Sequence, residues 1–207
     1  MTIICISDTH NKHEDLHIPE GDILIHAGDI TESGTKRELK SFFEWFKNQP
    51  HTHKICIAGN HDFYLESASE KELKTLIPES VHYLCDDQVE INNLKFWGAP
   101  HTPIPNRWAF GKDTPTIEQH WNKIPKDTNI LITHTPPYDI LDESYEQDAL
   151  GCAILRDRVK KIKPQFHIFG HMHNNYGIVK FSETTFVNAT SFNDSYSLIN
   201  NPIKLTL

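Results

Sequence analysis

Short runs of apolar, mostly β-branched residues recur along the chain, and each run stops at a Gly, Asp, Asn or His. These runs are Thr2–Ser7, Asp22–Ala27, Lys54–Ala58, Asn129–Thr133 and Phe166–Phe169. Because the runs are mostly apolar on both faces, we expect strands that are buried between two layers. Strands that end at polar residues are typical of sheets whose carboxyl ends open into a site.

Amphipathic segments lie between these runs and are predicted to be helices. In the clearest one, Thr35–Asn48, the side chains of Leu39, Phe42, Phe43 and Phe46 fall within an arc of roughly 100° at about 100° per residue. A second segment, Cys152–Lys163, also gathers its apolar residues on one face. Shorter helices are expected at Ser69–Ile77 and Thr116–Lys123.

The C-terminal part of the chain shows no helical pattern. Its apolar runs are joined by short polar turns, which is typical of antiparallel strands at Gly177–Phe181, Thr184–Val187 and Pro202–Leu207, and a similar pair is expected at Gln88–Ile91 and Leu94–Gly98. Together the patterns predict an α/β fold, a four-layer α/β/β/α sandwich with two mixed β-sheets. Two long segments, Ala99–Pro105 and Pro136–Leu150, are predicted to be loops over a site.

The composition narrows the classes of protein that remain. A chain of 207 residues with 38% hydrophobic residues is expected to form one domain, residues 1–207. The net charge of -8 argues against binding along a long nucleic acid, and no apolar stretch is long enough for a membrane span. Asp8 and His10 come too early for a signal-peptide core. The four cysteines form no Cys-x-x-Cys pair, which favours a reducing, cytoplasmic setting.

Side chains that can bind metal follow three predicted strands in the N-terminal part. An Asp-x-His triplet supplies Asp8 and His10, which can point the same way from an extended segment. A Gly-Asp pair supplies Asp29, whose two carboxylate oxygens can bridge two cations. A Gly-Asn-His-Asp tetrapeptide supplies Asn60 and His61. Taken singly, the triplet is also typical of a solvated loop and the tetrapeptide of a turn that ends a strand.

Two further predicted strands end at histidine. His134 follows Asn129–Thr133, and a Gly-His-x-His turn supplies His171 and His173. A lone histidine after a strand is usually structural, but two histidines at i and i+2 can face a common pocket. Because five strand-terminal turns have no other reason to carry such ligands, we interpret them as one site. Two Asp, one Asn and four His without cysteine suit Mn, Fe, Zn, Co or Ni rather than a thiolate-rich structural zinc site.

The order of these motifs resembles the calcineurin-like metallophosphoesterase superfamily, whose pattern is Asp-x-His, Gly-Asp, Gly-Asn-His-Asp/Glu, His and Gly-His-x-His. All five motifs occur in this order between Ile4 and Asn188. The resemblance implies two divalent metal ions, most readily Mn²⁺ in vitro, with Asp29 as the bridge. The implied ligands are Asp8, His10, Asp29 and His173 for the first ion, and Asp29, Asn60, His134 and His171 for the second.

Shorter stretches resemble a narrower subgroup, the small metallophosphoesterase-domain-containing proteins that include brain-expressed animal members. These stretches are Ile23–Thr31, Ile57–Asp62, Gly98–Pro100, Trp121–Pro125 and Gly151–Cys152. Animal members of this subgroup can lack the first histidine of the last motif, whereas this chain has His171. The resemblance therefore implies a complete second metal site.

The implied activity is hydrolysis of a phosphoester by a metal-bridging hydroxide, and the subgroup implies a phosphodiesterase for small or cyclic nucleotide phosphodiesters. His61 would stabilise or protonate the leaving oxygen. Asp62 would orient His61, or else would support the surrounding structure or cap a helix. A phosphomonoesterase or protein phosphatase is the alternative function. A non-catalytic scaffold on the same fold is a third, and the presence of His61 and of every ligand argues against it.

Loop residues near these motifs are candidates for contacting a substrate. Trp108, Phe110 and Tyr138 would stack on a nucleobase, while Arg107 and His101 would meet phosphate or sugar. For each of them, packing in the core or at the rim is the competing interpretation. The expected partner is a small phosphoester, such as a nucleotide, rather than a long nucleic acid or a membrane. The sequence predicts neither the natural substrate nor the oligomeric state.

Overall fold

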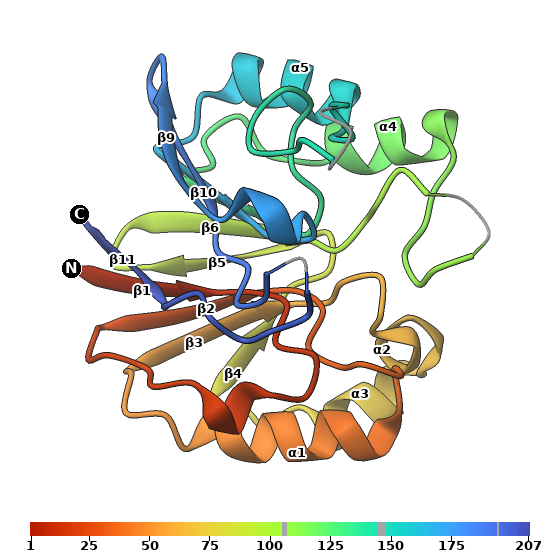
Figure 1. The fold of residues 1–207 in the computed structure, drawn as a ribbon, viewed down its shortest axis with the longest axis vertical. Helices are drawn as coiled ribbons and strands as arrows, with labels where there is room; N and C mark the ends of the chain where they lie inside the picture. The colour runs from red at the N-terminus through yellow and green to blue at the C-terminus, as the bar shows by residue number, and fades with distance from the viewer. Residues whose placement is uncertain (105–106, 145–147, 194) are drawn as a thin grey trace.

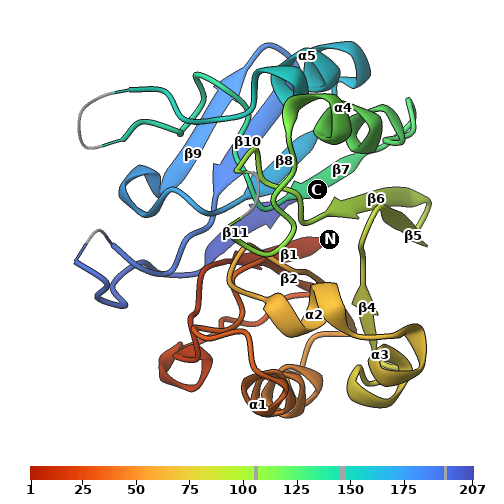
Figure 2. The same cartoon turned by 90° about the vertical axis from the view of Figure 1, so that its right-hand side faces the viewer.

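The structure is a computed structural model that describes residues 1–104, 107–144, 148–193 and 195–207. Two mixed β-sheets lie face to face, and helices cover both outer faces (Figure 1). Helices α1 (Lys36–Lys47) and α3 (Glu70–Leu76) cover one sheet, whereas α4 (Thr114–Asn122) and α5 (Ala153–Ile162) cover the other (Figure 2). The predicted four-layer α/β/β/α sandwich with two mixed sheets is confirmed.

The first sheet has five strands in the order β11-β1-β2-β3-β4. Their bounds are β1 (Thr2–Ile6), β2 (Ile23–Ala27), β3 (His53–Ile57), β4 (Val81–Tyr83) and β11 (Ile203–Thr206). Strands β1 to β4 pair in parallel, and β11 runs antiparallel to β1 at the edge. The carboxyl ends of β1, β2 and β3 therefore lie along the same edge of this sheet.

The second sheet has six strands in the order β5-β6-β7-β8-β10-β9. Their bounds are β5 (Asp87–Ile91), β6 (Leu94–Ala99), β7 (Ile130–Thr133), β8 (Phe166–Phe169), β9 (Gly177–Phe181) and β10 (Thr184–Asn188). The four central strands are parallel, and the antiparallel strands β5 and β9 form the two edges. The antiparallel pairs predicted near both edges are present.

The apolar residues of β1 show why its sequence is hydrophobic on both faces. Ile3 and Cys5 belong to the core between the two sheets, whereas Ile4 and Ile6 pack in the layer beneath α1. Successive side chains of a strand point to opposite faces, so a strand covered on both sides must be apolar at every position. On the helix side, α1 buries the four predicted residues Leu39, Phe42, Phe43 and Phe46.

Helix α1 begins where its sequence allows the first turn to be capped. The Thr35 hydroxyl accepts a hydrogen bond from the backbone N–H of Glu38, and the Glu38 carboxylate accepts one from the backbone N–H of Thr35 at 2.7 Å. This capping box satisfies two backbone donors that the helix itself cannot pair. A Ser69–Glu72 capping box starts α3 in the same way. Within the described residues, no helix combines the length and apolar character that crossing a bilayer requires.

Some short elements were not predicted. Helix α2 (Phe63–Ser67), strand β4 and the short 3-10 helices at His13–Asp15 and His173–Asn175 have too few residues to show a hydrophobic period. Ala99, the first residue of the first predicted loop, still belongs to β6. The other described residues of the two predicted loops form only isolated β-bridges. Residue 105 of the first loop and residues 145–147 of the second lie outside the described residues.

Two fully buried histidines, His26 and His167, lie within strands β2 and β8. The Nε2 atom of His26 lies 2.9 Å from the Thr9 hydroxyl, and that of His167 lies 2.8 Å from the Thr133 hydroxyl. Burial lowers the pKa of each ring to about 3, far below that of an exposed histidine. Both rings are therefore neutral in the folded protein and would be protonated in the unfolded chain below about pH 6.5.

We predict that replacing His167 with glutamine makes the stability less sensitive to acid. The folded pKa is depressed, so the stability from a neutral His167 is present above the unfolded pKa and is lost as the pH falls toward the folded pKa. Between pH 7.5 and 5, this single group is expected to remove about 2 kcal/mol from the free energy of unfolding. Urea unfolding of both proteins at the two pH values measures the difference, and equal losses would contradict the prediction.

Candidate metal centre

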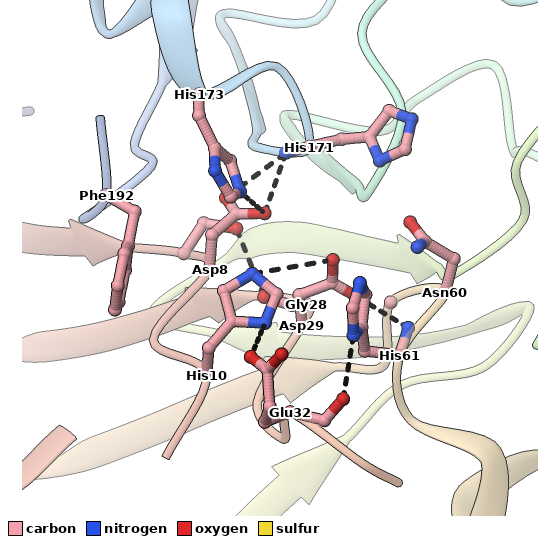
Figure 3. Close-up of polar contacts among 12 residues, drawn as sticks. Asp8, His10, Gly28, Asp29, Glu32, Asn60, His61, His171, His173 and Phe192 are labelled. Atoms are coloured by element: carbon pink, nitrogen blue, oxygen red, sulfur yellow. Dashed lines mark hydrogen bonds and ion pairs between the residues drawn. The ribbon is translucent and has the colours of Figure 1, made fainter. Parts of the chain in front are cut away.

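The two β-sheets meet along the edges at which their parallel strands end in polar residues. Asp8, Asp29 and Asn60 follow β1, β2 and β3 of the first sheet, and His171 follows β8 of the second (Figure 3). His134 follows β7. Direct hydrogen bonds join the edges. The backbone N–H of His171 donates to both carboxylate oxygens of Asp8, at 3.0 and 3.1 Å. The His134 Nδ1 atom lies 2.9 Å from the Ala27 carbonyl oxygen.

The predicted ligands fall into two compact groups. Asp8, His10 and His173 form one group, and Asp29, His134 and His171 form the other. Within each group, the donor atoms lie within 4.8 Å of one another.

Asp29 lies between these two groups. Its Oδ2 atom is 3.2 Å from His134 Nε2 and 3.9 Å from His10 Nε2. Asn60 joins the second group, because its Oδ1 atom lies 3.0 Å from the same His134 nitrogen. The structure thus brings all seven predicted ligand residues together, in two groups on either side of one carboxylate.

Nearby imidazoles hold the buried carboxylates in their ionised form. Burial alone would raise the pKa of Asp8, but the hydrogen bond and charge of His173 outweigh it and keep that pKa below its ordinary value. The pKa of Asp29 is lowered in the same way beside His134, whose own pKa rises to about 9 because the charge of Asp29 outweighs burial. Burial and the charge of His134 lower the pKa of His171 to about 4. The carboxylates therefore keep the charge that a cation would bind, and a cation bound there would displace the protons of His134 and His173.

Four of the seven ligand residues have a left-handed backbone. The angle φ is 53° at Asp8, 39° at His10, 52° at Asp29 and 69° at His171. Residues with a Cβ atom rarely adopt this region, and such strain gathers at functional sites. These turns end the strands at once, which lets ligands from separate segments converge on one small volume.

Glycines beside the ligands permit the close approach of the turns. A Cβ atom at Gly170 would lie 2.1 Å from Asp8 Oδ2. At Gly28, where φ is +99°, a Cβ atom would lie 2.5 Å from His134 Nδ1. Neither position has room for a larger residue. The glycines of the Gly-Asp and Gly-His-x-His motifs are therefore part of the site geometry, although they offer no ligand atoms.

The chemistry of the donor atoms fits divalent cations. Neither ring nitrogen of the buried His10 has a hydrogen-bond partner within the described part of the chain, although carboxylate oxygens of Glu32 and Asp29 lie 3.4 and 3.9 Å away. Unpaired buried polar atoms are costly, and a bound cation would satisfy the nitrogen lone pairs and the converging carboxylate oxygens together. Nitrogen and oxygen donors without thiolates suit transition metals of the Mn to Zn series. The fold and these donor groups define an α/β sandwich protein with a candidate site for divalent cations.

His61 stands beside the two groups with one side of its ring already engaged. Its Nδ1 atom lies 2.8 Å from the backbone carbonyl oxygen of Glu32, and its ring centroid lies 4.7 Å from that of His10 (Figure 3). A carbonyl oxygen can only accept, so Nδ1 carries a proton and Nε2 is left for the cavity. The Glu32 carboxylate also lies 3.4 Å from His10 Nδ1, so Glu32, His10 and His61 form a third group of possible ligands.

The side chain of Asp62 is hydrogen-bonded to the backbone of the turns after β2 and β3. Its carboxylate accepts hydrogen bonds from the backbone N–H groups of Ile30 at 3.2 Å, Thr31 at 2.9 Å and Gly59 at 2.8 Å. Burial and the charge of Asp29 raise its pKa to about 6. It caps no helix by a side-chain hydrogen bond. These contacts favour the supporting role over direct orientation of His61, which stays a prediction.

A cavity of about 370 Å³ opens over the ligand groups. Among the predicted substrate contacts, only Trp108 lines it, lying against the His61 ring with centroids 4.7 Å apart. Tyr196 also lines the cavity, with its ring 5.3 Å from that of His173. The remaining described wall residues are His10, Asp29, Asn60, His61, Ile104, Ser144, Leu150, His171, Met172, His173 and Asn174.

The other predicted substrate contacts lie outside this cavity, and its geometry does not support them. Phe110 is only 4% exposed and packs in the core beneath α1. His101 is 3% exposed, and its Nε2 atom lies 3.0 Å from Asp86 Oδ1. Tyr138 and Arg107 are exposed but do not line the cavity.

Sequence reasoning missed two residues at this site. Glu32 lies three positions after Asp29, and an acidic residue so close to a ligand motif is a signal that could have suggested it. Tyr196 lies in a polar C-terminal segment that carries no motif. Its place beside His10 and His173 depends on how the segment after β10 folds back over the site, and no local pattern shows this.

Comparisons with known proteins show the family and support the fold. The profile of the calcineurin-like phosphoesterase family matches residues 1–175. Metallophosphoesterase domain-containing protein 1 of Homo sapiens is 34% identical, over 99% of this chain and 70% of that protein. A Coxiella burnetii protein named probable cyclic nucleotide phosphodiesterase is 25% identical, over 81% of this chain and 66% of that protein. The solved structure of TT1561 from Thermus thermophilus matches with a TM-score of 0.65 at 15% identity, over 90% of this chain and 88% of that chain.

The chain belongs to the calcineurin-like phosphoesterase family. The family acts on phosphoesters and typically binds divalent metals, which agrees with the two ligand groups at the strand ends. The Thermus thermophilus structure adds support for the fold alone. The identity of the metal and of the substrate must be argued from the site itself.

We predict that Gly170→Ala weakens metal binding at least about tenfold while the core stays folded. The new Cβ atom would lie 2.1 Å from Asp8 Oδ2 and would push this carboxylate out of its group. Calorimetric titration with Mn²⁺ measures the loss, and circular dichroism checks the fold. Gly177→Ala is the control for strain outside the site, because alanine is disfavoured at its φ of +147° although the Cβ atom would meet nothing within 4 Å. Equal Mn²⁺ affinity in the two variants would contradict the predicted role of Gly170.

Proposed function

We propose that the chain is a binuclear metal-dependent phosphodiesterase that acts on small phosphodiesters, cyclic nucleotides included. The observation that carries the proposal is the arrangement of two ligand groups on either side of Asp29, with the half-engaged ring of His61 beside them. A site that only stored metal would have no use for a histidine whose free nitrogen is left for the cavity. Mn²⁺ is the expected metal in vitro, with Fe, Zn, Co or Ni as alternatives.

The ligand residues would divide between two cations. Asp8, His10, Asp29 and His173 would hold one, and Asp29, Asn60, His134 and His171 the other. Bound there, the cations would provide a hydroxide nucleophile at neutral pH and neutralise the phosphate oxygens. The chain itself fixes the spacing, because Asp8 is held by the His171 backbone and Asp29 by the His61 backbone N–H at 2.8 Å.

His61 would act on the leaving group. The Glu32 carbonyl oxygen accepts a hydrogen bond from His61 Nδ1–H and so fixes the tilt of the ring. In the protonated ring, Nε2 would donate a hydrogen bond or a proton to the leaving oxygen of the phosphodiester. Asp62 would act indirectly, by holding the turns that carry Asp29 and Asn60.

The cavity favours a small phosphodiester over the alternatives. Its volume of about 370 Å³ falls within the range of small-molecule sites, so a folded phosphoprotein has little surface to engage there. Among the described wall residues there is neither Lys nor Arg. A diester carries one negative charge and needs less positive charge from the protein than a dianionic monoester does. Trp108 and Tyr196 offer aromatic faces for a nucleobase, and the name of the Coxiella burnetii relative agrees with this substrate class.

The cysteines fit the cytoplasmic setting that we propose. All four are free thiols, and Cys5, Cys56 and Cys152 are buried. Burial raises the pKa of the Cys5 thiol well above its ordinary value, so the thiol stays protonated and unreactive. A chain without disulfides suits a reducing compartment.

A rate panel tests the proposed function. With Mn²⁺ bound, we expect hydrolysis of bis-p-nitrophenyl phosphate to be faster than that of p-nitrophenyl phosphate, with measurable turnover of cyclic nucleotides. The expected preference follows from the absence of basic side chains among the described cavity walls. A faster rate on the monoester would favour a phosphomonoesterase, and normal metal content without turnover of any phosphoester would favour a scaffold.

We predict that His61→Ala keeps both metals but reduces turnover of a cyclic nucleotide roughly 10²- to 10⁴-fold. The loss should be smaller with bis-p-nitrophenyl phosphate, whose leaving group is stable without a proton. Metal content by atomic emission and steady-state rates on the two substrates measure the effect. A collapse of the metal content in this variant would show that His61 is a ligand and would refute its assigned role.

A further inference from the structure

A second cluster of titratable side chains lies apart from the strand-terminal site. Asp86 comes from the connection between β4 and β5, His101 follows β6, and His120 and Lys123 lie at the end of α4. Asp86 Oδ1 is 3.0 Å from His101 Nε2, and Asp86 Oδ2 is 2.5 Å from His120 Nδ1. Each carboxylate oxygen therefore faces a different imidazole. The cluster joins three segments that are far apart in the sequence.

The three donor atoms form a compact ligand set. One oxygen of Asp86 and one nitrogen each of His101 and His120 lie within 4.8 Å of one another. Two imidazoles and a carboxylate are a common ligand set for Zn²⁺ and its neighbours, with water completing the coordination. His101 is almost fully buried, and its other ring nitrogen, Nδ1, has no hydrogen-bond partner in the described part of the chain.

The protonation states suit a metal at neutral pH. Burial lowers the pKa of His101 more than the charge of Asp86 raises it, so the ring is neutral. Burial would raise the pKa of Asp86, but the hydrogen bonds from His101, Lys123 and His120 outweigh it and keep the carboxyl ionised. A metal ligand must have a free lone pair, and these two groups have one without losing a proton.

The ammonium group of Lys123 pairs with the carboxylate that would bind the metal, so it competes with a metal cation. Its ammonium group lies 2.7 Å from Asp86 Oδ2, while its side chain is 51% exposed. An exposed ammonium exchanges a carboxylate for water at little cost, so it can leave when a divalent cation arrives. Lys123 would then compete with the metal for Asp86 instead of forming a permanent ion pair with this carboxylate.

We propose that Asp86, His101 and His120 form a third divalent-metal site, selective for Zn²⁺-like cations and opposed by Lys123. The bound cation would fasten the end of α4 to the connection between the two sheets and to the segment after β6. This site shares no ligand with the strand-terminal groups. The proposal therefore stands whether or not the proposed phosphodiesterase function is correct.

Native mass spectrometry of the full chain during Zn²⁺ titration tests the proposal. Wild type is expected to bind one more zinc ion per chain than His120→Ala, with the third ion weakened at least about tenfold in the variant. His17→Ala is the matched control, because His17 is an exposed histidine outside both sites, and should bind as many ions as wild type. Equal zinc counts in wild type and His120→Ala would overturn the proposal.

Lys123→Met gives a test in the opposite direction. Removing the competing ammonium should tighten the third zinc ion roughly two- to fivefold, the value of one exposed ion pair. Removing an ordinary ion pair would leave zinc affinity unchanged or lower, and that result would overturn the proposal. Because Lys123 is half exposed, this variant should fold even if His120→Ala does not. Strand-terminal metals contribute equally to every variant and cancel in the comparison.

Discussion

Two buried carboxylates constrain the rest of the structure. Asp8 is fully buried and Asp29 nearly so, yet both are held in their ionised form. A buried charge is tolerated only where partners replace its lost water. For Asp8 these partners are the backbone N–H of His171 and the ring of His173, both contributed by the other sheet. The two sheets meet through hydrocarbon over most of their area, but at this edge they meet through charge.

This constraint explains the unusual backbone of the site. Ligands from both sheets can surround two carboxylates only if the strands turn sharply as soon as they end. Left-handed conformations at Asp8, His10 and Asp29 achieve this, at a cost of roughly 1–2 kcal/mol per residue. The strain is offset elsewhere, because the layers of Ile, Leu and Phe on either side of each sheet are almost completely buried. The apolar core therefore provides the stability of the fold, whereas the strained turns at the sheet edge provide the geometry of the site.

Most of the fold and the convergence of the seven candidate ligands could be predicted from the sequence, because both depend on local order along the chain. A strand with apolar residues on both faces must lie between layers, and a ligand placed directly after it must lie at the sheet edge. Residues whose position depends on distant packing could not be predicted. Phe110 sits near the ligand turns in sequence but turns into the core, whereas Tyr196 reaches the cavity from a segment without any motif. Strand β4 and helix α2 are too short for periodicity to reveal them.

The side chains of the adjacent residues His61 and Asp62 point in different directions and make different contacts. The His61 ring lines the cavity, while the Asp62 carboxylate points into the protein and binds three backbone N–H groups. Those hydrogen bonds connect the turn after β3 to the turn after β2, and so they set the distance between Asn60 and Asp29. An acidic residue at this position can therefore affect the geometry of the candidate site without lining its cavity. Its effect would pass through the spacing of the ligands, since Asn60 and Asp29 each lie close to the same nitrogen of His134.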